Sequence, residues 1–169
     1  MVKSKIKSLK WTEHPGDIML QETIQLEKLR QNIEDAEFES GNQSDYLDHG
    51  KPTGQQAKSA QEYITRMESK SRELKSELYE LIATVRRDKP QALEEWIKIH
   101  KDILGRILAE QKSDSKTKVR QNVARETLQA WEKVLAGERE YVGINWYYMK
   151  DYKAEVKKLV NKDWWKFWK

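Results

Sequence analysis

Few side chains in this 169-residue sequence have the types and spacing that catalysis or metal binding requires. Asp45, Asp48 and His49 bring two carboxylates and an imidazole together, a set of donors that could ligate a metal ion. No second ligand motif occurs elsewhere, so we interpret this group as part of a polar loop. His100 falls on the apolar face of a predicted helix, one turn from Trp96, which favours a packed, hydrogen-bonded imidazole over a general base.

The remaining candidates for chemistry are weaker still. Glu94 and Glu95 are adjacent in sequence, so on a helix their carboxylates do not face each other. The sequence contains no phosphate-binding glycine loop, no nucleophile elbow, no H-E-x-x-H pair and no cysteine. We therefore expect a protein that is not an enzyme, with no cofactor and no metal site.

The side chains best suited to binding are basic. They lie in the segment KSDSKTKVRQNVAR: Lys112, Lys116 and Arg120 follow one another at four-residue spacing, and Lys118 and Arg125 lie seven residues apart on a neighbouring strip. On a continuous helix they would form a ridge about two turns long that can hold phosphate groups. Features of a helix-turn-helix are missing, so sequence-specific base recognition is not expected. A solvated helix face is the alternative interpretation.

A second candidate binding segment is the C-terminal stretch NKDWWKFWK. At 100° per residue it forms a basic amphipathic helix with an aromatic face, on which the candidate docking residues are Trp164, Trp165, Phe167 and Trp168. Three interpretations remain open: packing on its own bundle or a neighbouring copy, docking to a protein partner, and binding at a membrane surface.

Composition predicts the fold class that positions these residues. Charged residues make up 36% of the chain, hydrophobic residues 37%, and there are only seven Gly and three Pro, which is typical of long amphipathic helices. The net charge of +4 is unevenly placed, because residues 11–50 have a balance of −8 and residues 51–169 a balance of +8. We predict an all-α, elongated helical bundle with long coiled-coil-like helices and an antiparallel helical hairpin.

The expected boundaries follow from breakers and hydrophobic periodicity. They divide the chain into a basic N-terminal arm (1–16), an acidic helix (17–39) with Asp17 as N-cap, a loop or hinge (40–55), a long helix plus helical hairpin (56–137) ending at Gly137, and an aromatic linker with the basic amphipathic C-terminal helix (138–169). No apolar run is long enough for a transmembrane helix, and we do not expect the basic start of the sequence to act as a secretory signal.

From Ala60 to Val85 the predicted long helix keeps a regular heptad spacing. Ser71 is the one polar residue at the apolar positions of this pattern. We expect this seam to have spare apolar surface and to mediate self-association. The residues assigned to oligomerisation are Ile64, Met67, Leu74, Leu78, Leu81 and Val85.

The hairpin consists of LEEWIKIHKDILGRILAE, a polar turn at Ser113–Ser115, and SKTKVRQNVARETLQAWEKVLAG. Its second helix should point Val119, Val123, Leu128, Trp131, Val134 and Leu135 inward. Over about residues 90–137 this pattern resembles the helical oligomerisation hairpin of small terminase subunits of tailed phages. The resemblance implies a ring-forming, non-catalytic protein that binds viral DNA and hands it to a packaging motor. Many members begin with a helix-turn-helix domain, which residues 1–56 do not resemble.

Together these observations predict a non-enzymatic, homo-oligomeric helical subunit of a nucleic-acid-handling assembly, with DNA packaging as one such process. Two alternatives stay open: a helical adaptor or scaffold that acts through coiled-coil and Trp-rich tail contacts, and a peripheral membrane protein that uses its C-terminal helix. We expect a cytoplasmic location, which would be the host cytoplasm for a viral protein.

Overall fold

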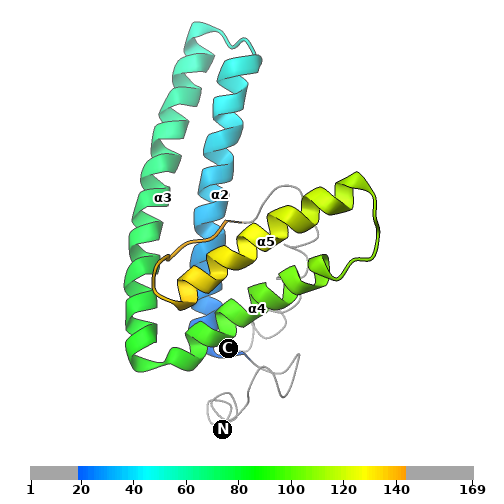
Figure 1. Ribbon diagram of the computed structural model, residues 1–169. Helices are drawn as coiled ribbons and strands as arrows, with labels where there is room; N and C mark the ends of the chain where they lie inside the picture. The colour runs from blue at the N-terminus through cyan, green and yellow to red at the C-terminus, as the bar shows by residue number, and fades with distance from the viewer. Residues whose placement is uncertain (1–18, 144–169) are drawn as a thin grey trace.

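The computed structural model describes residues 19–143, and this part of the chain is all-helical, as predicted. Its helices are α2 (Gln21–His49), α3 (Gly54–Asp88), α4 (Pro90–Leu108) and α5 (Ser115–Leu135). Figure 1 shows α2 and α3 side by side, with the α4–α5 hairpin lying across the end of that pair where α2 begins and α3 ends. None of the helices between residues 19 and 143 is both long and apolar enough to cross a membrane.

The predicted loop at 40–55 is wrong, because α2 continues through this segment to His49 and leaves only residues 50–53 for the turn. Gly41 costs the helix roughly 1 kcal/mol relative to alanine, but α2 lies beside α3 as far as the turn (Figure 1), and Leu47 in this segment is half-buried. The turn itself uses a left-handed residue, Lys51, with a φ of 49°. Asp17, the predicted N-cap, lies outside the described residues.

The apolar seam predicted for α3 is present, and part of it packs against α2 of the same chain. Leu78 and Val85 are fully buried in the core with Leu26 and Ile33 of α2, while Ile64 is 7% exposed. Met67, Leu74 and Leu81 are half-buried. Part of the seam from which self-association was expected is thus buried within the chain, and Met67, Leu74 and Leu81 keep some apolar surface exposed.

Helices α4 and α5 form the predicted hairpin, and each end of α5 is capped. At the start, the Asp114 side chain accepts a hydrogen bond of 2.8 Å from the Thr117 backbone N–H. At the end, Gly137 takes a φ of +82°, the left-handed conformation that terminates many helices. Arg86 of α3 also donates to the carbonyl oxygens of Val134 and Leu135, at 2.9 and 3.1 Å.

Two residues of α5 do not point inward as predicted. Val119 is 38% exposed and Leu135 is 41% exposed. The helix instead turns Ala124, Trp131 and Val134 into the core. At 100° per residue Val119 lies about 120° or more from Ala124 and Trp131, whereas Leu135 is the last residue of the helix.

Candidate functional site: a basic hairpin tip and a buried charge cluster

The five basic residues predicted to bind phosphate all lie at the hairpin tip, which we define as residues 105–125. Lys112 is in the turn, and the other four, Lys116, Lys118, Arg120 and Arg125, lie on the first half of α5. Figure 1 shows that the turn between α4 and α5 points away from α3, so the tip projects from the α2–α3 pair.

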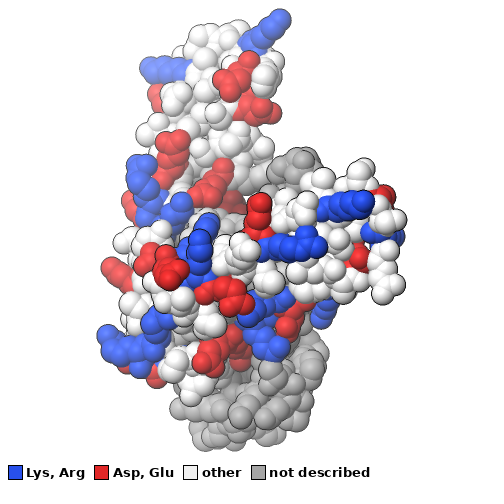
Figure 2. Space-filling model, in the orientation of Figure 1, with Lys and Arg blue, Asp and Glu red and all other residues white. Residues whose placement is uncertain are grey.

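The hairpin tip is the most basic part of the described chain. It has six Lys or Arg residues and two acidic residues, a balance of +4, whereas α2 has two basic and eight acidic residues, a balance of −6. Figure 2 shows several Lys and Arg side chains along the hairpin on the face in view. Of the two acids at the tip, Asp114 is engaged in capping α5.

The structure separates the five predicted residues into two groups. Lys112, Lys116 and Lys118 are exposed and form no ion pair with residues 19–143. Arg120, in contrast, is half-buried with its Nη2 3.4 Å from a Glu110 carboxylate oxygen, and Arg125 donates to the Asn122 side-chain oxygen at 2.8 Å. The three lysines are therefore the charges most available to a ligand.

The other predicted sites are less informative. Asp45 and His49 lie one turn apart at the exposed end of α2, in a helix rather than the expected loop, with 3.7 Å between His49 Nε2 and Asp45 Oδ1. Within the described chain, no group of three His, Asp or Glu side chains is arranged to hold a metal ion. The predicted docking residues Trp164, Trp165, Phe167 and Trp168 lie outside the described residues.

The sequence analysis missed a buried carboxylate where α2 meets α4. Glu27 is fully buried, and five donors converge on it. Arg30 donates through Nε and Nη2 at 2.9 and 2.8 Å, and Gln31 donates at 2.9 Å. From α4, Trp96 Nε1 lies 3.0 Å and His100 Nε2 2.5 Å from Glu27 Oε1. A carboxylate with this many donors stays ionised and fixes the two helices relative to each other.

Arg30 extends this contact to a third part of the chain. Its Nη1 donates to Glu34 at 3.0 Å and to the backbone carbonyl of Val142 at 3.3 Å. We call Glu27, Arg30, Glu34 and His100 the buried charge cluster. It joins α2, α4 and the segment after α5 through polar contacts closed to solvent.

His100 is fully buried, as the sequence analysis favoured, and it lies between aromatic rings. Its imidazole stacks on Trp131 of α5 with 4.1 Å between ring centroids and 12° between planes. Trp96 meets the Trp131 ring edge-on at 5.0 Å. The side chain of His100 thus connects the polar contact with α2 to the aromatic contact with α5.

The protonation states follow from competing effects. Burial raises the pKa of Glu27, but Arg30 and His100 lower it by more, so its pKa lies below the ordinary value. Burial lowers the pKa of His100, and Glu27 opposes that shift only in part. The geometry therefore fits a neutral imidazole whose Nε2–H donates to the Glu27 carboxylate.

A second buried carboxylate lies on α4 nearer its start. Glu95 is 7% exposed, and its Oε1 accepts a hydrogen bond of 3.0 Å from the Leu20 backbone N–H. Burial raises the pKa of Glu95 to about 7, although this backbone bond, Thr23 and Lys89 each lower it somewhat. Near neutral pH, Glu95 is therefore close to half-protonated.

No family model, curated protein or solved structure matches this chain. The interpretation of the candidate site therefore rests on its geometry alone.

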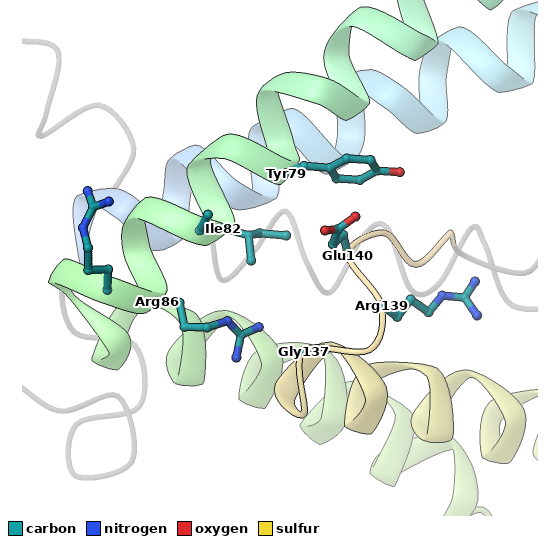
Figure 3. Close-up of a pocket in the computed structure, with 8 residues that line it drawn as sticks. Tyr79, Ile82, Arg86, Gly137, Arg139 and Glu140 are labelled. Atoms are coloured by element: carbon teal, nitrogen blue, oxygen red, sulfur yellow. The ribbon is translucent and has the colours of Figure 1, made fainter.

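Hollows on the described surface are lined in part by charged side chains that make contacts within the chain. The one in Figure 3, about 340 Å³, lies between α3 and residues 137–140. Arg86 points from it toward the end of α5, where it holds two carbonyls, and Arg139 donates to the Tyr141 carbonyl at 2.8 Å. Two of the charged side chains that line it, Arg86 and Arg139, are therefore engaged in structural contacts.

Proposed function

We propose that this chain is a non-enzymatic helical subunit of a nucleic-acid-handling assembly that binds the phosphate backbone through the hairpin tip. The observation that carries the proposal is the exposure of Lys112, Lys116 and Lys118, without ion pairs to the described residues, at the tip of a projecting hairpin, where residues 105–125 have a balance of +4. Such a surface gains affinity when lysines replace the counterions condensed on nucleic acid.

The backbone of the tip is suited to this role because it is held in one geometry. Gln121 Nε2 lies 3.4, 3.3 and 2.9 Å from the carbonyl oxygens of Ile107, Leu108 and Glu110, which ties α5 to the end of α4. The Asp114 carboxylate caps the first turn of α5 and offsets the partial positive charge of the helix N-terminus, so the positive charge of the tip comes from its Lys and Arg side chains. Little order need be imposed on this backbone when a ligand binds.

The tip is too small to read a sequence. From Lys116 to Arg125 the helix rises about 14 Å at 1.5 Å per residue. This length suits contacts with about three phosphates rather than with a row of base edges. We expect the logarithm of the binding constant to fall with the logarithm of salt concentration with a slope of about −3.

The test is a fluorescence anisotropy titration of a duplex oligonucleotide at several salt concentrations. A variant with Lys112, Lys116 and Lys118 replaced by glutamate should lose binding and its salt dependence. The matched control replaces exposed lysines of the turn and α3, Lys51, Lys58 and Lys70, with glutamate, giving the same change in net charge. Equal weakening in the two triple variants would mean that net charge, and not the tip, governs binding.

Assembly into a homo-oligomer is a separate part of the proposal, supported by the resemblance of residues 90–137 to the terminase hairpin. Because Leu78 and Val85 of the α3 seam are buried within the chain, a subunit contact along this seam would use its half-exposed residues Met67, Leu74 and Leu81. Multi-angle light scattering at micromolar concentration tests it, and a monomer would contradict it. Absence of nucleic-acid binding at every salt concentration would favour the adaptor alternative.

A further inference from the structure

Helix α4 presents two buried ionisable side chains to α2. Glu95 and His100 are five residues apart, about 7.5 Å along the helix axis. Glu95 is bonded to the Leu20 backbone at the start of α2, and His100 to Glu27 almost two turns later. The attachment of the α4–α5 hairpin to α2 therefore has two polar ends.

At the His100 end, the charged groups with the largest effect on the imidazole within the described chain come from α2. These groups are Glu27, Arg30 and Glu34, whereas α5 contributes the uncharged ring of Trp131. A proton added to His100 places a second positive charge near Arg30 in a site closed to water. A proton added to Glu27 instead leaves Arg30 buried with a weakened partner. Either event makes the closed interface less favourable.

The Glu95 end responds in the opposite sense. The groups near this carboxyl are Glu22 and Thr23 of α2, the Leu20 N–H, and Lys89 just before α4. Acid neutralises a carboxylate that is costly to bury, so protonation favours the contact there. Lowering the pH thus weakens one end of the interface and preserves the other.

We propose that this interface is a pH-sensitive switch, in which acid releases the hairpin from α2 at the buried charge cluster while the Glu95 end serves as the pivot. The switch is a property of the fold and does not depend on nucleic-acid binding. Opening would move the hairpin tip relative to the α2–α3 pair and leave the helices intact.

The size of the effect follows from proton linkage. An open state exposes His100, which then takes up a proton below its ordinary pKa of about 6.5, while the closed state resists protonation. Each pH unit below that value therefore shifts the ratio of open to closed molecules by up to tenfold. Between pH 6.5 and pH 5 the shift is at most about 30-fold.

The chain has no cysteine, so spin labels can be attached at chosen sites. Ser76 on α3 and Ser113 in the turn of the α4–α5 hairpin are exposed. Spin labels on cysteines at these two positions report the distance between α3 and the hairpin tip. Pulsed electron paramagnetic resonance from pH 7.5 to pH 5 should show a second, longer distance population that grows as the pH falls, while circular dichroism keeps its helical signal.

The deciding variant is His100→Gln, because the glutamine amide keeps an N–H near the position of Nε2 and does not titrate. Its distance distribution should stay constant over this pH range, whereas His49→Gln, a change at an exposed histidine, should behave as wild type. The same pH response in wild type and His100→Gln would overturn the proposal.

If the interface between α2 and the hairpin is already open in His100→Gln at pH 7.5, a measurement on the wild-type protein tests the proposal instead. Nuclear magnetic resonance with ¹⁵N-labelled histidine should then show the neutral Nε2–H form of His100 giving way to a protonated form in step with the longer distance. Protonation of His100 without any change in distance would refute the switch.

Discussion

Replacing Glu95 with glutamine should stabilise the protein above pH 7 and have little effect near pH 4.5. Glutamine has the shape of the protonated side chain, and its oxygen can still accept the hydrogen bond from the Leu20 N–H. It differs in having no carboxyl proton to lose. The variant therefore isolates the cost of ionising this one buried carboxyl.

The magnitude follows from the pKa, which burial raises from the ordinary 4.5 to about 7. Between these values the folded protein holds a proton that the unfolded chain has lost, so the stability that this proton provides is present at low pH and is lost as the pH rises to 7. A difference of about 2.5 pKa units corresponds to about 3 kcal/mol, at 1.36 kcal/mol per unit. The amide accepts a weaker bond than a carboxylate, which reduces the expected gain at pH 8 to about 2 kcal/mol.

Urea unfolding followed by circular dichroism at pH 5, 6, 7 and 8 measures this gain. Other titrating groups act on both proteins alike, so the difference between variant and wild type is the quantity to compare. Glu94→Gln is the matched control, because Glu94 is the exposed neighbour on the same helix turn. A Glu95→Gln effect of equal size at pH 5 and pH 8 would refute the argument.

Four further changes can be measured by the same urea unfolding at pH 7. Glu27→Gln leaves Arg30 buried with Glu34 as its remaining carboxylate partner and should destabilise the protein by about 3 kcal/mol. Trp131→Ala removes a buried ring and should cost about 3–5 kcal/mol. Leu135→Ala, at a side chain that is 41% exposed, should cost less than about 1 kcal/mol. Gly137→Ala should cost about 1–2 kcal/mol, because its φ of +82° is unfavourable for a residue with a Cβ atom.

Hydrophobic periodicity was enough to predict the helices that bury one continuous stripe. The 3-4 spacing from Ala60 to Val85 predicted α3, and Gly137 correctly marked the end of α5. Periodicity could not say what would cover the α3 stripe, because that depends on how far α2 extends. The polar residues after Ser40 look like a loop in isolation, yet packing on α3 keeps them helical.

The buried charge cluster was missed because charged side chains were assumed to face solvent. Glu27, Arg30 and Glu34 have the i, i+3, i+7 spacing of a helix face, which is the signal that could have revealed them. The sequence could predict the basic residues of the hairpin tip, but not that Arg120 and Arg125 have partners within the hairpin. Those contacts depend on where the turn places Glu110 and on the orientation of Asn122.

The separations along the chain within the buried charge cluster have a consequence for the order of folding. Each helical hairpin is closed by a short turn, and contacts of this kind form with little loss of chain entropy. The contacts of Glu27 with Trp96 and His100, however, join residues 69 and 73 positions apart, and that of Arg30 with Val142 spans 112. We therefore expect the two hairpins to form before they dock. Substitutions in the cluster should then accelerate unfolding while leaving the refolding rate nearly unchanged.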